Sequence, residues 1–179
     1  MDKLVKFLNF GLGLVLVGAL AGAIGLFTWQ RMDWIFKQEY LRSQVVLDRQ
    51  IDLIENINAD VGSLIADADS VIAVIVKQAP GKQRNQVIER YNDEQASWFS
   101  VSVSHQALLG FYFPDSISVE FREGIVNATK KLDVEVYKYA KNNTIDQRKK
   151  SYEASRQVWH QLQAWNKLAM KHLQSKFTL

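Results

Sequence analysis

A stretch of twenty-two residues near the start of the chain, Phe7 to Thr28, contains no charged side chain. As a helix it would be about 33 Å long, enough to cross a hydrocarbon core of about 30 Å. Lys3 and Lys6 precede the stretch, and Trp29 and Trp34 follow it where an interfacial aromatic belt is expected. This pattern predicts a single transmembrane helix.

A cleavable signal peptide is the alternative interpretation of this stretch, because Ala19-Leu20-Ala21 resembles a cleavage site. The apolar run continues beyond that site as far as Phe27, which favours a retained anchor. We therefore divide the chain into an anchor, residues 1–30, and a water-soluble domain, residues 31–179.

Small residues in the predicted span recur with helical spacing. Gly11, Gly18 and Gly25 follow one another at intervals of seven residues. Such a face lets a second helix approach closely, although glycine is also simply tolerated in membrane helices. The residues expected to pack in the membrane are Gly11, Gly18, Ala21, Gly22 and Gly25. From them we expect self-association into a homo-oligomer larger than a dimer.

The charges around the span leave its orientation open. Two lysines precede it, whereas Arg31, Lys37 and Arg42 follow it within the window of the positive-inside rule. The N-terminal lysines are compatible with a periplasmic domain, and the basic C-terminal half suits the cytosol. We expect a bacterial inner-membrane protein with a cytosolic domain, in which Arg31 and Lys37 would lie at the mouth of any pore.

The sequence after the predicted span predicts four helices. Apolar residues from Leu47 to Ile75 alternate spacings of four and three, interrupted by Asn58, and Pro80-Gly81 is expected to stop this first helix at about Gln78. Further helices are expected over about 83–112, from Ser116 or Ser118 to about 141, and over about 145–175. Strand-like alternation over 97–104 leaves a short strand or a break there open. The predicted fold is all-α: a transmembrane helix continuing into an up-down four-helix bundle.

Composition excludes several classes of chemistry. The chain has no cysteine, so disulfides, thiolate zinc sites and cysteine nucleophiles are ruled out. The net charge of +3 is unevenly distributed: residues 44–79 are acidic and residues 126–179 strongly basic. Two solvated helix faces that attract each other would explain this distribution. A basic half that meets lipid headgroups, RNA or another anionic ligand is the alternative.

No catalytic motif stands out among the ionisable residues. No phosphate-binding glycine loop is present, and the three histidines lack metal-ligand spacing, so neither a cofactor nor a metal is expected. His105 follows Ser102 and Ser104, without an identifiable third catalytic partner. We interpret that arrangement as chance and expect no enzymatic activity.

One pair of residues suggests a family resemblance. Arg156 and His160 lie four residues apart and project from one face of a helix. The pair resembles the Arg-x4–6-His motif of HEPN domains, with one intervening residue fewer than usual. Together with the predicted anchor and bundle, the layout looks like that of the small membrane accessory proteins of type VI-B CRISPR systems. That resemblance implies an antiviral pore-forming protein.

Three functional hypotheses follow from the sequence. The first is an oligomeric membrane protein that perturbs or permeabilises the inner membrane. The second is a non-catalytic membrane-anchored scaffold that recruits a protein partner. The third is a membrane-tethered HEPN-like ribonuclease using Arg156 and His160.

Overall fold

The computed structural model describes residues 2–175, with side chains for residues 31–175. Its elements are α1 (Asp2–Val76), α2 (Gly81–Tyr112), α3 (Asp115–Glu120), the π-helical segment η1 (Phe121–Val126), α4 (Asn127–Asn142) and α5 (Ile145–Ser175). Two compact units are present, Met1–Val46 and Leu47–Leu179, and helix α1 belongs to both.

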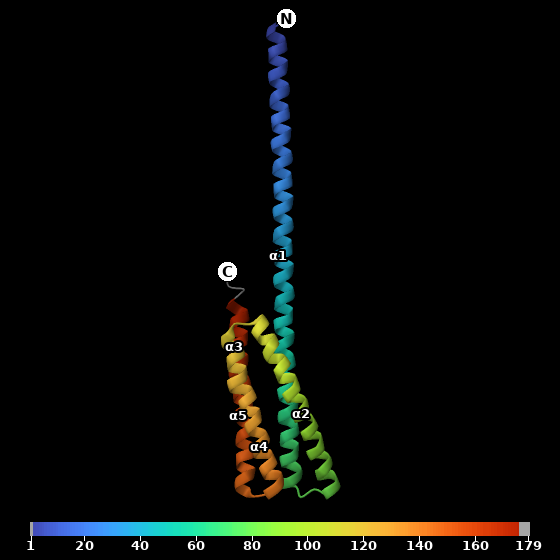
Figure 1. Ribbon diagram of the computed structural model, residues 1–179, viewed down its shortest axis with the longest axis vertical. Coiled ribbons are helices and arrows are strands. Elements are labelled where there is room, and N and C mark those ends of the chain that lie inside the picture. Colours follow the sequence, from blue (N-terminus) through green and yellow to red (C-terminus); the bar gives the residue numbers. More distant parts are fainter. Residues whose placement is uncertain (1, 176–179) are drawn as a thin grey trace. The chain divides into compact units, whose positions relative to one another are not determined.

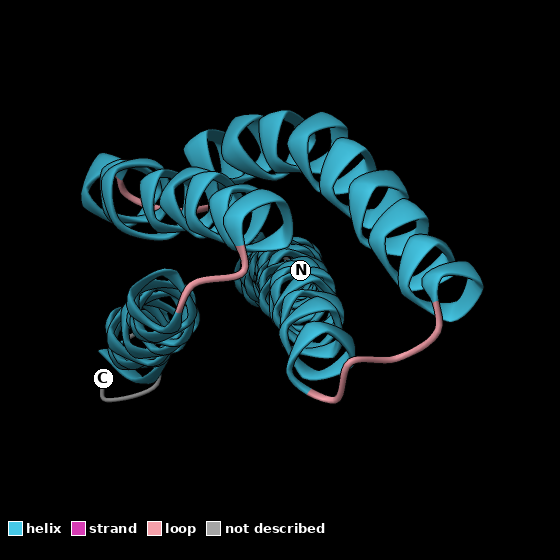
Figure 2. Cartoon of the chain, turned by 90° about the horizontal axis from the view of Figure 1, so that it is seen from below, coloured by secondary structure: helices cyan, strands magenta, loops and turns pink. Residues whose placement is uncertain are grey.

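The all-helical prediction is confirmed over the described residues. The segments α3, η1 and α4 follow one another without a break, so residues 2–175 form four successive helices. The alternating stretch 97–104 lies inside α2 and is helical, not a strand. In the second unit, successive helices run in opposite directions (Figure 1). Short connections join them, as the view from the loop end shows (Figure 2).

The predicted apolar seam of the first soluble helix forms the core of the second unit. Ile57, Val61, Leu64, Ala68 and Ile72 are almost completely buried. They pack with the largest buried side chains of the other helices, Trp98, Trp165 and Phe121. Each indole nitrogen donates a hydrogen bond, from Trp98 to Thr129 Oγ1 at 2.9 Å and from Trp165 to the Ile117 carbonyl at 3.1 Å. The apolar seam of α1 therefore packs against the other helices of the same chain.

Asn58, the polar member of the seam, pairs with α5. Its Nδ2 donates to Asn166 Oδ1 at 3.1 Å, and Asn166 Nδ2 donates back to Asn58 Oδ1 at 2.6 Å. The two amides thus satisfy each other in a partly buried position. This reciprocal pair specifies the register of α5 against α1, because sliding either helix would leave both amides without partners.

Helix α1 ends differently from the sequence prediction. The left-handed residue is Gln78, with φ of 52°, and no described glycine has positive φ. Hydrogen bonds from Ala79 N to Val74 O and from Gln78 N to Ile75 O complete a Schellman motif. Pro80 and Gly81 instead begin α2. Helix α4 ends similarly, on Asn143 with φ of 48°.

Within the side chains described, residues 31–175, no helix is long and apolar enough to cross a membrane. The predicted span, residues 7–28, lies outside that range, as do Gly11, Gly18, Ala21, Gly22 and Gly25. The backbone of this stretch belongs to helix α1.

Candidate functional site

The predicted functional pair, Arg156 and His160, lies on the outer surface of α5. Both side chains are exposed, as is Trp159 between them. Neither residue makes a hydrogen bond or an ion pair with another described residue. The pair therefore has no bonded acid or base in the described part of the chain. Its geometry can support contact with a ligand, but it does not assemble a reaction site.

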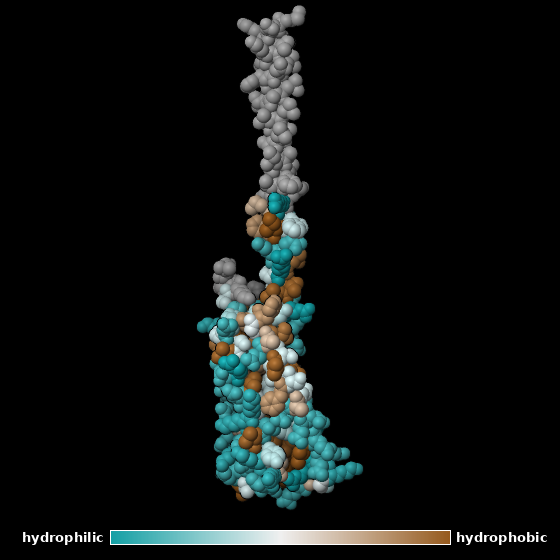
Figure 3. Space-filling view, viewed as in Figure 1, coloured by the Kyte–Doolittle hydropathy of each residue, from teal (hydrophilic) through white to brown (hydrophobic). Residues whose placement is uncertain are grey.

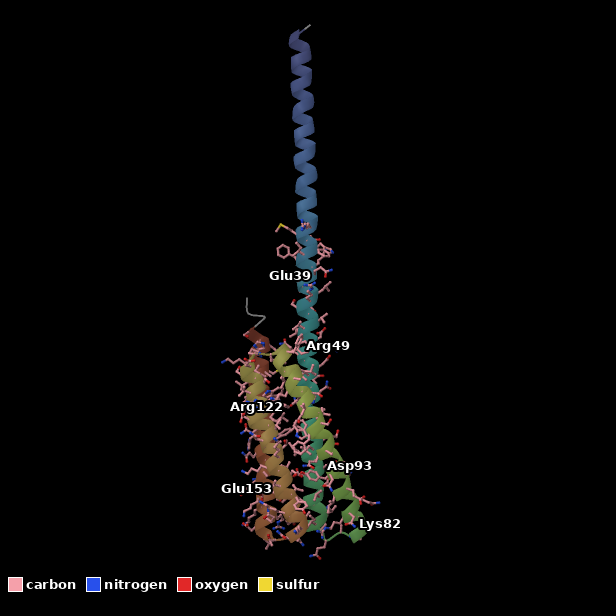
Figure 4. All side chains as sticks on the ribbon, viewed as in Figure 1. Glu39, Arg49, Lys82, Asp93, Arg122 and Glu153 are labelled. Carbon is pink, nitrogen blue, oxygen red and sulfur yellow. The ribbon has the colours of Figure 1, made fainter. Side chains whose placement is uncertain are left out.

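The basic C-terminal half is a solvated surface with partial internal neutralisation. Lys150 pairs with Asp146 at 2.8 Å and Lys138 with Glu135 at 3.0 Å. The hydrogen bond from Lys138 holds the pKa of Glu135 below its usual value. Glu153, an acidic residue of this half, also points outward (Figure 4). Charge on this surface is therefore mixed, which favours a solvated face over a dedicated anion site.

A partly buried histidine–aspartate pair joins α1 to α2. His105 Nε2 lies 2.7 Å from Asp60 Oδ2, and the imidazole is enclosed by the rings of Trp98 and Phe121 at centroid distances of 6.4 and 6.5 Å. The His105 side chain is 7 % exposed. The sequence did not reveal this pair, because Asp60 lies forty-five positions away and only the packing of α2 against α1 brings it close.

This pair is not part of a hydrolase triad. The Ser102 hydroxyl donates to the Phe99 carbonyl, and His105 Nδ1 has no hydrogen-bond partner within residues 31–175. A nucleophilic serine needs contact with the base that accepts its proton. The arrangement instead anchors α2 to α1, through one strong hydrogen bond surrounded by aromatic rings.

A shallow cavity of about 250 Å³ opens between α1, α2 and α4. Its lining includes Tyr91, Asp133 and Tyr137. Burial, followed by the nearby Asp133 charge, raises the pKa of Tyr91. Burial also raises the pKa of Asp133, and the neighbouring Tyr91 and Gln95 side chains partly oppose this rise. The volume is slightly below the usual range of ligand pockets, which begins near 300 Å³.

The exposed face of α2 is unusual because it lacks charge. From Gln95 to Pro114 the sequence contains no Asp, Glu, Lys or Arg. Val103 is 69 % exposed and Phe111 80 % exposed, and Leu108 is also exposed. Small exposed residues lie on the same side of the helix: Ala96, Ser100, Ser104, Ala107 and Gly110. We call the exposed residues from Ala96 to Phe111 the α2 face.

The hydropathy of the surface shows the same contrast between α2 and the rest of the bundle. White and brown surface covers the upper part of α2, and the lower end of the bundle is mainly teal (Figure 3). Scattered apolar residues on a surface are ordinary, whereas a contiguous exposed apolar patch marks an interaction site. The α2 face is therefore the strongest candidate binding site in the second unit. The sequence alone does not reveal this face, because the exposed and the buried residues of the segment are equally uncharged.

The remaining predicted site residues are on the first unit. Arg31 and Lys37 are exposed, and Lys37 pairs with Asp33 at 2.8 Å on its own helix. Among the described residues, no cluster of three metal-ligating side chains occurs.

Comparison with known proteins identifies no relative: no family model, no curated protein and no solved structure matches the chain. The resemblance to the membrane accessory proteins of type VI-B CRISPR systems is wrong on this finding, as is its HEPN-like assignment. The described residues also contain no helix able to cross a membrane. The resemblance rested on layout and on one Arg/His pair, which the structure leaves exposed and unpartnered. Such a layout is too general to define a family.

Proposed function

We propose that the chain is a non-catalytic, membrane-tethered scaffold whose helical bundle docks a protein partner through the α2 face. The observation that carries this proposal is the uncharged exposed strip from Ala96 to Phe111. Covering a side chain such as Val103 or Phe111 with a partner contributes about 1.5–3 kcal/mol each, so a few such contacts are sufficient to define an interface.

The chemistry of the α2 face specifies the kind of partner. It presents small residues beside isolated large apolar ones, so a partner helix can approach the backbone closely and bury Phe111 at its edge. An anionic ligand or RNA would need cations, and none lies on this face. We therefore expect a protein with an apolar helix or groove.

The tether in this proposal comes from the sequence. Residues 7–28 have the length and the absence of charge that a membrane-spanning helix needs. We place the protein in the bacterial inner membrane with the bundle in the cytosol. Deleting residues 7–28 should move the protein from the membrane fraction to the soluble fraction, and unchanged fractionation would contradict the tether.

Docking can be tested with a photo-reactive amino acid at Val103 in the full-length chain. Val134 on α4 is a matched control, since it is also an exposed valine, at 47 %. We expect one discrete cross-linked product from position 103, absent from position 134 and abolished by Phe111→Ser. Equal labelling from both positions, or no product from either, would refute docking at the α2 face.

Pore formation stays a prediction. It requires a conduit formed by residues 7–28, whose side chains lie outside the described residues, and bilayer conductance of the purified protein would test it. A ribonuclease activity has the least support, because Arg156 and His160 are exposed and have no acid or base partner among the described residues.

A further inference from the structure

Residues 31–46 of α1 carry an unusual density of exposed apolar side chains. Met32, Phe36 and Tyr40 are 54 to 64 % exposed, and Trp34, Leu41 and Val45 are 57 to 63 % exposed. Side chains extend from this stretch on several sides, including that of Glu39 (Figure 4). A surface of this kind is rarely left in water by a soluble monomer.

These six residues form two rows on opposite sides of the helix, and the less exposed Ile35 and Val46 lie between the rows on one side. Met32, Phe36 and Tyr40 follow one another at spacings of four, which places them in the first row. Trp34, Leu41 and Val45 form the second row, at spacings of seven and four. At about 100° per residue, the centres of the two rows are about 160° apart. A helix with one apolar side pairs with one neighbour, whereas a helix with two opposite apolar sides packs between two neighbours.

Charges border both rows. On one side of the helix, Arg31 and Arg42 border the second row and Glu39 borders the first row. On the other side, Lys37 lies nearer the second row and Asp33 nearer the first. All five charged residues are exposed. A membrane interior is a poor occupant for a stretch with this many interleaved charges.

The border charges discriminate between the ways in which parallel copies could pack. If the first rows of two copies met, Asp33 of one copy would face Glu39 of the other. If the second rows met, Arg42 would face Lys37. Both symmetric arrangements bring like charges together. Packing of the second row of one copy on the first row of the next brings Arg42 to Glu39 and Lys37 to Asp33, which are opposite charges. Flanking charges of this kind set partner choice and orientation between packed helices.

We propose that residues 31–46 form a two-sided interface through which parallel copies of this chain associate, the second row of each copy packing on the first row of the next. The interface is heterologous, so assembly continues beyond a dimer until it closes or forms an open array. This inference goes beyond docking at the α2 face and uses other residues. A shared membrane tether would reinforce the parallel arrangement, which the charges already favour.

The interface can be mapped with single cysteines, since the chain has none of its own. Ser43 projects in the direction of the first row, Val45 belongs to the second row, and Gln44 points between the rows. All three are exposed. We expect a short bis-maleimide to join Ser43→Cys chains to Val45→Cys chains when the two are co-expressed, with one carrying a size tag. The double variant Ser43→Cys/Val45→Cys should give a ladder of dimers, trimers and larger products.

Each single variant alone should give little product. Gln44→Cys lies on the border between Asp33 and Lys37, so it should give a lower yield than the mixed pair. Dimers from Ser43→Cys alone or from Val45→Cys alone would show a symmetric interface and overturn the proposal. A yield of cross-link between Ser43→Cys and Val45→Cys chains no higher than the yield from Gln44→Cys would show that membrane or another molecule covers the rows. That result would also overturn the proposal. The products are scored in whichever fraction holds the protein, so failure of the tether and failure of the interface are separate results.

Charge reversal gives a directional second test. In the mixed cross-link, Arg42 of the Val45→Cys chain faces Glu39 of the Ser43→Cys chain. Arg42→Glu on the Val45→Cys chain should lower the yield several-fold, and Glu39→Arg on the Ser43→Cys chain should restore it. The same two reversals placed on the opposite chains should not restore it. Equal rescue from both placements would contradict the proposed pairing, because a local effect within one helix would not depend on which chain carries each change.

Discussion

The reciprocal amide pair between Asn58 and Asn166 predicts a measurable energetic coupling between α1 and α5. Alanine at either position leaves the other amide partly buried without its partner, which costs about 1–3 kcal/mol. Alanine at both positions removes the two hydrogen bonds together. Each hydrogen bond contributes about 0.5–1.5 kcal/mol net, so the coupling energy of the double-mutant cycle should be about 1–3 kcal/mol.

The assay is chemical unfolding of the full-length protein in detergent, followed by circular dichroism and tryptophan fluorescence. A loss of 1 kcal/mol lowers the melting temperature of a unit of this size by about 3–6 °C, so thermal unfolding should give the same ranking. Asn56→Ala is the matched control, because Asn56 is an exposed asparagine one half-turn away on the same helix. Its effect should stay within about 0.5 kcal/mol.

Additive single substitutions would refute the reasoning. If the double variant lost as much stability as the sum of the two single variants, the amides would not be bonded to each other. The register of α5 against α1 would then depend on apolar packing alone.

Three further predictions concern single positions. Gln78→Gly should raise the free energy of unfolding by about 1 kcal/mol in the same assay, since glycine adopts the left-handed conformation of Gln78 without steric cost and Gln78→Ala should give no such gain. Asp133→Asn should stabilise the protein at pH 7 but not near pH 3. Burial raises the pKa of Asp133 in the folded protein, so the wild type loses stability as the pH rises from about 3.9 through that raised value. Near pH 3 the carboxyl group is protonated in both the folded and the unfolded protein, and the substitution brings no such gain. The exposed carboxylate Asp93, changed to Asn, is the control, and a pH-independent effect of Asp133→Asn would contradict this assignment. Arg156→Ala and His160→Ala should each change the free energy of unfolding by less than about 0.5 kcal/mol. RNA incubated with either purified variant should stay as intact as RNA incubated with the wild type. Cleavage of RNA by the wild type that both substitutions abolish would overturn the non-catalytic interpretation.

Local sequence patterns predicted the helices and the core well. The spacing from Leu47 to Ile75 identified buried residues of α1, and the helix expected over about 145–175 is α5, Ile145–Ser175. Proline and glycine also marked the break near residue 80. These features depend on neighbours within one or two helical turns, which a single sequence displays directly.

Contacts between distant segments could not be predicted in the same way. The Gln147 side chain on α5 donates to Glu135 on α4, and Asp60 meets His105 only when α2 packs on α1. The α2 face could not be predicted from the sequence for a related reason. Its uncharged sequence also supplies buried residues such as Trp98 and Leu109, and only the fold shows which members of the segment remain exposed.

The size of the native complex tests docking at the α2 face most directly. The full-length protein and its Val103→Asp/Phe111→Asp variant would be extracted from source cells in mild detergent and their complexes weighed by native mass spectrometry. Both changes lie on the α2 face, outside residues 31–46 and outside the buried core. We predict that the wild-type complex is heavier than the variant complex by the mass of a distinct partner, while self-association is unchanged. Complexes of identical mass and composition would contradict the proposal that this chain is a scaffold docking a partner through α2.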